Sequence, residues 1–359
     1  MASLAREVVT ATCWVEPVDH GDPCPVTIQF SGRRVGATGK PRPGDRFSQR
    51  ETAEIVPGSG PVSITTVAKG INAGDWVVTS RSVEGSARAA RLLPPPTDAD
   101  TDRVTRLLWP WRYQAICAAR SEKAKTALLP LAPVPGVIPL AYSVLIALGI
   151  LVGLTVQAVI VAQAGRSVAA AMSVSVWAVL AGLVGAKLWY VVGHRGRRFN
   201  GWCIQGFIFG AAIVASVLAP TLSMPVGTYL DSLTPGLLIG MGIGRIGCFF
   251  AGCCRGRPTA SRWGVWSSDQ RVGAHRFPAQ LFESTLCLVI GLVALILVVG
   301  SAGTPPGAVF VGAVAAYTFG RQFLLPLRAD PRHLAYGRTV VLAGTALLLA
   351  GDLLWSAHA

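Results

Sequence analysis

Seven long apolar runs constrain the fold of this chain more than any other feature of its sequence. A helix needs about 20 predominantly apolar residues to cross a hydrocarbon core of about 30 Å, and each run comes close to that length. Hydrophobic residues make up 52% of the chain and charged residues only 14%, a balance that is rare in soluble domains. The sequence therefore predicts an α-helical polytopic membrane protein with about seven transmembrane helices over residues 136–359. The expected spans are Gly136–Val161, Val168–Val192, Trp202–Leu218, Leu233–Phe250, Ala279–Val299, Ala308–Leu325 and Gly337–Leu354.

The fourth run, Leu233–Phe250, is the richest in glycine. Glycines in a membrane helix let neighbouring backbones approach closely, or they allow a broken, re-entrant end that protein or water must surround. Both structures remain open for this span. The glycines in and just after it include Gly240, Gly242, Gly244, Gly247 and Gly252.

The first 135 residues have a different pattern. Apolar and polar residues alternate over Val26–Phe30, Val62–Val67 and Trp76–Ser80, and Gly, Pro and Asp residues separate these runs. Such alternation between turn residues is typical of short antiparallel strands with one buried face. We therefore expect a small N-terminal β-sandwich-like soluble domain over residues 1–90.

A linker and a basic helix are expected over residues 91–135. Three prolines, Pro94–Pro96, and three aspartates follow the β domain. Arg103–Ala127 then combines arginines and lysines with Leu, Ile and Trp side chains, which is typical of an amphipathic helix on a membrane surface with anionic headgroups. The net charge of +14 is spread along segments that flank membrane spans, and no nucleic-acid recognition motif accompanies it. The expected partner of these cations is the membrane, and no nucleic acid.

A stretch rich in glycine, arginine and cysteine, Gly244–Thr259, closes the fourth apolar run. A charged side chain near the centre of a bilayer costs about 2.5–3.5 kcal/mol on insertion scales, so an intramembrane arginine usually faces a polar cavity or an anionic group. A guanidinium stays charged at neutral pH and binds phosphate oxygens in a bidentate manner. We therefore expect Arg245 to bind the phosphate of an anionic lipid.

This stretch resembles the signature of bacterial prolipoprotein diacylglyceryl transferases, Gly-Arg-x-Gly-Asn-Phe-x-Asn-x-Glu-x-x-Gly-Arg. The resemblance covers about residues 137–355. It implies transfer of the diacylglyceryl group of phosphatidylglycerol to the lipobox cysteine of a prolipoprotein, with release of glycerol phosphate. It also implies a multi-pass protein of the bacterial cytoplasmic (inner) membrane that needs no cofactor. Further segments that are similar to family motifs are Gly185–Tyr190, Asp231–Gly236, Arg276–Glu283 and Tyr317–Arg321 with Arg328.

The resemblance carries functional roles onto ten residues of this chain. It implies catalytic roles for four of them, namely Arg245, Arg321, Gln205 and Cys253. It implies substrate binding by the other six, namely Tyr317, Glu283, Gln280, Arg276, Arg257 and Cys248. No metal ligand is assigned.

Several polar positions of the family pattern are changed. Gln205 stands where the family has a histidine, and Cys248 and Cys253 stand where the signature has Asn and Glu. Transfer requires a deprotonated thiol, whose ordinary pKa is about 8.5, and an amide is no base at neutral pH. Glu283 or His275 could take up the proton only if the fold brings one of them to the acceptor thiol.

Two other functions remain open. A relative that has lost these polar groups could bind an anionic phospholipid without transferring part of it. Cys248, Cys253 and Cys254 could instead form a thiol redox centre, an acyl-accepting nucleophile or a metal site, although the spacing Cys-x4-Cys-Cys lacks the second pair typical of zinc sites. Thiols that only fill a helix interface give the same pattern.

Two lines of sequence evidence disagree on the membrane orientation. Arginines and lysines concentrate in the N-terminal flank and around Arg195–Arg198, Arg255–Arg276 and Arg328–Arg338, which by the positive-inside rule places the N-terminus in the cytoplasm. The resemblance implies the reverse, with the arginine-rich face outside, and this is the orientation that we expect.

Overall fold

The computed structural model describes residues 7–17, 19–36, 42–83, 90–92, 122–128, 134–193, 201–300, 304–329 and 335–358. Its contacts divide the chain into two compact units. The first, here called the sheet unit, comprises Met1–Leu145, Arg245–Phe282 and Leu324–Arg332. The second, here called the helix unit, comprises Ile146–Gly244, Glu283–Phe323 and His333–Ala359. Each unit is thus assembled from segments that are far apart in the sequence.

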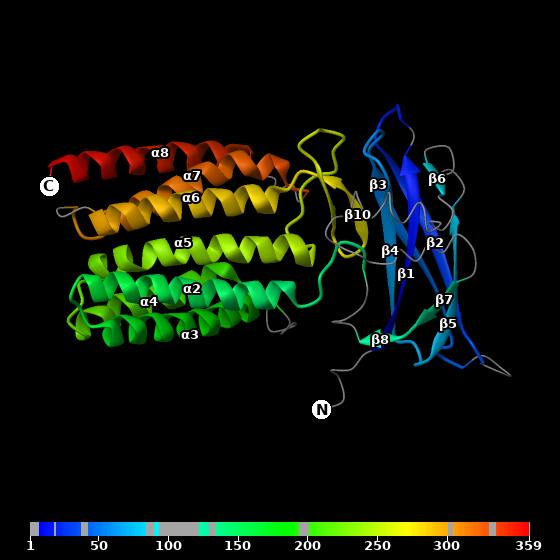
Figure 1. The fold of residues 1–359 in the computed structure, drawn as a ribbon, viewed down its shortest axis with the longest axis horizontal. Coiled ribbons are helices and arrows are strands. Elements are labelled where there is room, and N and C mark those ends of the chain that lie inside the picture. Colours follow the sequence, from blue (N-terminus) through cyan, green and yellow to red (C-terminus); the bar gives the residue numbers. More distant parts are fainter. Residues whose placement is uncertain are drawn as a thin grey trace. The chain divides into compact units, whose positions relative to one another are not determined.

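Seven helices among the described residues are long and apolar enough to cross a membrane, which confirms the predicted number. The larger part of each belongs to the helix unit, and Figure 1 shows the helices running alongside one another. Their bounds lie within five residues of the expected spans except at the start of α5, and α2 starts at Ala141 instead of Gly136. They are α2 (Ala141–Gln163), α3 (Val168–Gly193), α4 (Ile204–Thr221), α5 (Val226–Ala251), α6 (Ala279–Gly300), α7 (Ala308–Leu324, continued by a 3-10 turn, Leu325–Leu327) and α8 (Ala335–His358).

Helix α5 starts at Val226 instead of Leu233 and runs without a break to Ala251. Polar residues in its first turns hid this earlier start from a reading of hydropathy. One of them, Asp231, accepts hydrogen bonds from the backbone N–H groups of Gly307 at 2.6 Å and Phe310 at 2.9 Å. The first N–H groups of a helix have no partner within the helix, and the Asp231 carboxylate supplies hydrogen-bond acceptors for two N–H groups at the start of α7. A paired carboxylate is tolerated in a membrane helix where an unpaired one is not.

Glycines on α2 and α5 let the two backbones touch. A Cβ atom at Gly149 would lie 2.5 Å from the carbonyl oxygen of Gly240, and one at Gly153 would lie 2.8 Å from that of Gly236. A backbone oxygen cannot rotate away as a side chain can. Of the two structures left open for the fourth run, the protein therefore adopts close helix packing, the small-residue contact typical of membrane helices.

Gly149→Ala is expected to lower the midpoint of thermal unfolding of the detergent-solubilised protein, because overpacking a close contact costs about 1–3 kcal/mol. Gly344→Ala on α8 is the matched control, since a Cβ atom there would meet nothing within 4 Å. The control is expected to raise the midpoint, because alanine is the better helix former by about 0.8–1.0 kcal/mol. Equal shifts of the two variants would contradict a direct contact between the backbones of α2 and α5.

The sheet unit contains two antiparallel sheets, as the alternating runs predicted. One has the strand order β6-β1-β4-β10-β9 with β8 also paired to β1, and the other has the order β3-β2-β5-β7. Buried side chains of both sheets, among them Ile64, Phe30 and Trp76, form one hydrophobic core. The strands are β1 (Glu7–Pro17), β2 (Cys24–Arg34), β3 (Arg46–Ile55), β4 (Val62–Lys69), β5 (Asp75–Ser82), β6 (Ala90–Leu92), β7 (Glu122–Lys125), β8 (Ala127–Leu128), β9 (Val265–Ser268) and β10 (Val272–Arg276).

Two strands of the first sheet, β9 and β10, come from the segment that follows α5. β10 lies beside β4 in Figure 1 and pairs with it through Val272 opposite Ile64. The indole ring of Trp266 on β9 stacks on that of Trp14 on β1, with the ring centroids 5.7 Å apart. The structure thus differs from the expected division into a β domain over residues 1–90 and a separate membrane domain from residue 136.

The prediction of an amphipathic helix over Arg103–Ala127 is wrong for the C-terminal end of that segment. Residues 93–121 lie outside the described residues, but from Glu122 the chain forms strands β7 and β8. β7 pairs with β5, and its Ala124 is buried while the next residue, Lys125, is exposed. This alternation of one inward and one outward side chain is the period of a strand, and the free edge of β5 supplies the backbone partners.

Candidate functional site

The signature segment reverses direction directly after α5, at Gly252. Its φ of +71° lies in the left-handed region, and a Cβ atom there would be 2.5 Å from the carbonyl oxygen of Ser268. The reversal brings the backbone N–H of Cys253 to 3.0 Å from the carbonyl oxygen of Cys248. Glycine is favoured at this position past a helix end because it adopts the left-handed conformation without steric cost. The sequence Gly252-Cys253-Cys254 therefore folds back over the last turn of α5.

Three cysteine thiols converge at this reversal. The Sγ atoms of Cys248, Cys253 and Cys254 lie within 4.8 Å of one another. Cys248 is buried, and the other two are partly buried. The Nη1 atom of Arg245 lies 4.0 Å from Sγ of Cys254. The structure thus brings together three predicted site residues, Arg245, Cys248 and Cys253, and adds Cys254, which sequence reasoning had considered only as part of a thiol centre.

The two thiols beyond the end of α5 have opposite pKa shifts. Hydrogen bonds from the thiols of Cys248 and Cys253 lower the pKa of the Cys254 thiol, and the cations of Arg328 and Arg245 lower it further. The pKa of the Cys253 thiol is raised by its hydrogen bonds to Cys248 and Cys254 and by burial. The surroundings thus stabilise the thiolate form of Cys254 more than that of Cys253, and the guanidinium of Arg245 is one of the groups responsible.

Arg276, a predicted substrate-binding residue, is buried and bound by the protein itself. Its Nη2 atom lies 3.1 Å from Oδ2 of Asp269, and its two terminal nitrogens donate to the carbonyl oxygens of Gly256 and Val272, each at 3.3 Å. Burial lowers the pKa of the Arg276 guanidinium, and the negative charge of Asp269 opposes that shift. These contacts tie the segment after α5 to strand β10.

Asp269 is the residue of this site that sequence reasoning missed. Its side chain is 6% exposed, and Oδ2 also lies 3.1 Å from Nε of Arg255 in an ion pair. Its Oδ1 accepts hydrogen bonds from the backbone N–H groups of Arg271 at 2.9 Å and Val272 at 2.6 Å. The available signal was a single carboxylate among the arginines of Arg255–Arg276. One carboxylate thus serves two arginines and the turn between β9 and β10.

Gln280 and Arg257 also bond to backbone atoms of the sheet unit. Nε2 of Gln280 donates to the carbonyl oxygen of Cys253 at 2.8 Å, which fixes the peptide of a cluster residue. Nε of Arg257 donates to the carbonyl oxygen of Arg328 at 3.1 Å, and the Arg257 side chain is exposed. That these two side chains bind substrate stays a prediction.

The other four predicted residues belong to the helix unit. The Glu283 carboxylate, 5% exposed, accepts a 2.6 Å hydrogen bond from the hydroxyl of Tyr317. The same oxygen, Oε1, lies 3.3 Å from Nε of Arg321 in an ion pair. α6 and α7 thus bring three predicted residues together. Gln205 is exposed at the start of α4, where its Oε1 accepts a hydrogen bond from the thiol of Cys203 at 2.7 Å.

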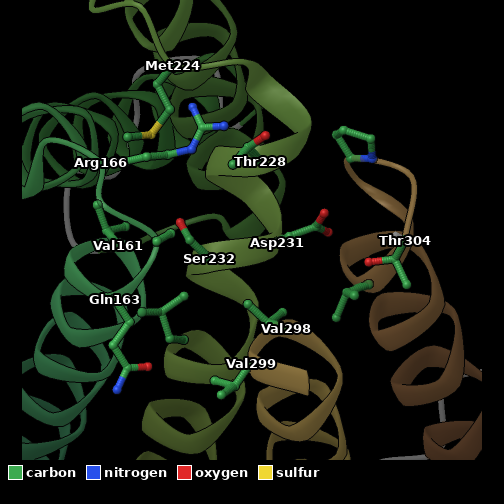
Figure 2. Close-up of a pocket in the computed structure, with 14 residues that line it drawn as sticks. Val161, Gln163, Arg166, Met224, Thr228, Asp231, Ser232, Val298, Val299 and Thr304 are labelled. Atoms are coloured by element: carbon green, nitrogen blue, oxygen red, sulfur yellow. The ribbon is translucent and has the colours of Figure 1, made fainter. Parts of the chain in front are cut away.

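A cavity of about 350 Å³ lies elsewhere in the helix unit. Figure 2 shows the side chains around it, including Arg166, Thr228, Asp231 and Thr304. The Asp231 carboxylate is already bound to the start of α7. Among the described residues that line the cavity, none is one of the ten predicted site residues. The cavity therefore adds no support to the predicted site.

Known proteins resemble part of this chain. A family model described as prolipoprotein diacylglyceryl transferase matches residues 135–356. A phosphatidylglycerol–prolipoprotein diacylglyceryl transferase of Frankia alni is 30% identical in an alignment of 236 residues that covers 60% of this chain and 62% of the relative. One of Clostridium tetani is 28% identical in an alignment of 204 residues that covers 53% of this chain and 81% of the relative. One of Clostridium perfringens is 32% identical in an alignment of 168 residues that covers 43% of this chain and 65% of the relative.

The family match includes both groups of candidate site residues. The chain spans less than two thirds of the length of the Frankia alni relative, and the strands before residue 135 lie outside the family model. The model nevertheless covers more than half of the chain, from the start of α2 into α8, and with it the thiol cluster and the Glu283 ion pair. The chain therefore belongs to the prolipoprotein diacylglyceryl transferase family.

Proposed function

We propose that this protein transfers the diacylglyceryl group of phosphatidylglycerol to the lipobox cysteine of a prolipoprotein in the bacterial cytoplasmic membrane. Its relatives are named for that activity, and seven apolar helices give it access to a lipid substrate. The reaction forms a C–S bond and breaks the C–O bond between the diacylglyceryl carbon and the phosphate. Glycerol phosphate leaves with the bonding electron pair, and the thiol proton is released to water. An acceptor on the outer surface requires the arginine-rich face outside, as the resemblance implies.

The position of Arg245 is the observation that carries this proposal. Its guanidinium is partly buried near the end of an apolar helix, with Nη1 4.0 Å from a thiol. A guanidinium can hold two oxygens of a phosphodiester at once. The same group can stabilise the negative charge that grows on the departing phosphate. Arg245 thus provides, beside a cluster of sulfur atoms, the charge that a transfer from phosphatidylglycerol needs.

Arg321 is the second arginine to which we assign catalysis. It remains 33% exposed while Nε is paired with Glu283, and Tyr317 donates to the same carboxylate oxygen. Glu283 and Tyr317 are positioning residues in this proposal, because they fix the direction of the Arg321 side chain. Arg276 and Gln280 receive framework roles, since each is bonded to the segment that carries the cysteines.

Incubation of the purified full-length protein with phosphatidylglycerol and a synthetic lipobox peptide tests the proposal. The expected products are a peptide heavier by one diacylglyceryl group, measured by mass spectrometry, and an equal amount of glycerol phosphate. A peptide with serine in place of the lipobox cysteine is the control and should stay unmodified. Consumption of the lipid without modification of the peptide would indicate a different acceptor.

Binding of an anionic phospholipid without transfer is the second candidate function. The observation in its favour is Gln205, an exposed amide that is hydrogen-bonded to a neighbouring thiol and cannot accept a proton at neutral pH. In the same assay, phosphatidylglycerol that binds but is not consumed would favour this function over transfer.

A further inference from the structure

The proposed transfer leaves one chemical task without a residue. The acceptor thiol must lose its proton, and a thiol with a pKa of about 8.5 is only a few per cent ionised at pH 7. Gln205 cannot act as a base, and the carboxylate of Glu283 is occupied by Tyr317 and Arg321. His275 lies on β10, lines a different cavity with Trp14 and Trp266, and is not part of the group formed by the three thiols. The task therefore calls for a group that stabilises a thiolate directly.

The thiol cluster, Cys248, Cys253 and Cys254, has the size of a metal site. Zn²⁺ binds thiolate sulfur at about 2.3 Å, so sulfurs around one tetrahedral Zn²⁺ lie about 3.8 Å apart. The three Sγ atoms lie within 4.8 Å of one another, which is at most about 1 Å beyond that spacing. The local fold fixes this arrangement, because Gly252 turns the chain back and Gln280 holds the carbonyl oxygen of Cys253.

The charge around the cluster also suits zinc. Three thiolates and one Zn²⁺ carry a net charge of −1, which would be costly to bury without a counter-charge. The guanidinium of Arg245 lies 4.0 Å from Sγ of Cys254 and supplies that counter-charge. Thiolate ligands also favour zinc over the hard cations that prefer oxygen.

The cluster offers three ligands, not four. Within the described part of the chain, no histidine, carboxylate or further cysteine joins these three atoms in the group. A zinc ion with three protein ligands keeps its fourth position for water or substrate, which is the arrangement of catalytic zinc sites, whereas structural sites are closed by four protein ligands.

We infer that Cys248, Cys253 and Cys254 bind one Zn²⁺ ion whose fourth position takes the acceptor thiol and holds it as a thiolate. This inference rests on the proposed function, because it assigns the step that the function lacks. The acceptor thiol binds zinc and releases its proton to water. Its sulfur then attacks the diacylglyceryl carbon, the zinc–sulfur bond breaks as the C–S bond forms, and the C–O bond electrons leave with the phosphate beside Arg245. Water then takes the fourth position of the zinc ion again. No electron is transferred, so no oxidant or reductant is required.

Metal content is the first test. The full-length protein, purified in detergent with zinc and then freed of unbound metal, is expected to hold one zinc ion per chain by elemental mass spectrometry. Cys253→Ser should lose most of it, whereas Cys253→His, which keeps a zinc ligand, should retain it. Cys24→Ser is the matched control, since Cys24 lies on β2 outside the cluster. Copper in place of zinc, a protein without metal, or a disulfide within the cluster would overturn the inference.

Cobalt substitution tests whether the acceptor thiol binds the metal. The Co²⁺ form should show sulfur-to-cobalt charge-transfer absorption, and this absorption should increase when a lipobox peptide is added. The peptide with serine in place of its cysteine should leave the spectrum unchanged. If both peptides leave the spectrum unchanged, the fourth position does not take the acceptor thiol.

Metal removal separates this inference from the proposed function. Chelation should lower transfer at pH 7 by about tenfold or more, since only a few per cent of a free thiol is ionised there. The metal-free protein should recover rate as the pH rises through about 8.5, while the zinc form should change little. Undiminished transfer at pH 7 after chelation would overturn the zinc step and leave the function standing. If the spectrum of the cobalt form responds to the peptide but the zinc form transfers nothing, the metal site is confirmed and the proposed function is rejected.

Discussion

Arg245→Ala is expected to lower the rate of diacylglyceryl transfer by about 10²- to 10³-fold, the range found when one preorganised donor to a developing anion is removed. The physical reason is the position of its guanidinium, which is partly buried at the end of α5 with Nη1 4.0 Å from a cluster thiol. In such surroundings the negative charge of a departing phosphate is less screened by water than at the surface. The measurement is the initial rate of peptide modification at saturating peptide.

Arg245→Lys should restore only part of this rate, because an ammonium keeps the charge but loses the planar pair of donors. Arg271→Ala is the matched control for the loss of one cation, since Arg271 lies in the segment after α5 with its side chain 72% exposed. Its rate should stay close to that of the unchanged protein. If Arg245→Ala transfers at the rate of the unchanged protein but unfolds at a lower temperature, Arg245 has a structural role and not a catalytic one.

The number of membrane helices could be predicted because hydropathy and length are local properties of the sequence. The start of α5 could not be predicted in this way. Its first turns contain Tyr229 and Asp231, polar residues that hydropathy places outside a membrane span. The structure satisfies both side chains within the helix unit: Asp231 holds the start of α7, and the hydroxyl of Tyr229 lies 3.0 Å from that of Ser175. Polar groups with partners inside the protein can extend a membrane helix.

The β9–β10 hairpin shows a second limit of the sequence. Its strands are short, and the positive charge of the segment from Arg255 to Arg276 predicts a membrane-flanking loop. What makes it part of a sheet is the edge of β4 on the side away from β1, about 200 residues earlier in the chain, which pairs with Val272 and Gly273. Periodicity can indicate that a segment is a strand, as it did for Val62–Val67, but it does not indicate which distant strand pairs with it.

The candidate site was predicted in its residue types but not in its contacts. The signature pointed to Arg245 and the cysteines, and the fold brings them together. Arg276 also stood in a family motif, yet its guanidinium is bound by Asp269 and by two backbone carbonyl groups. Sequence pattern shows that a cation is present at a position, whereas its role depends on which carboxylate the fold places beside it.

Asp269→Ala is expected to lower the free energy of unfolding by about 3–5 kcal/mol, the cost of leaving one partner of a buried ion pair without the other. The Arg276 side chain is 5% exposed and that of Asp269 is 6% exposed, with Nη2 and Oδ2 3.1 Å apart. The measurement is denaturant unfolding in detergent. Glu51→Gln is the control, because it removes the charge of a carboxylate 3.8 Å from Arg271, an arginine that is 72% exposed, and keeps an acceptor for the hydroxyl of Thr66. Ion pairs that solvent screens in this way contribute about 0–1 kcal/mol.

Two further variants separate the charge of Asp269 from its role in the turn. Asp269→Asn keeps an acceptor for the backbone N–H groups of Arg271 and Val272 but removes the negative charge. If the ion pair is the cause, Asp269→Asn should lower the free energy of unfolding almost as much as Asp269→Ala does. Replacing both partners, Asp269→Leu with Arg276→Met, should recover stability relative to Asp269→Ala, because an apolar pair leaves no buried cation. A double variant as unstable as Asp269→Ala would show that the turn, and not the ion pair, holds the segment that carries the cysteines.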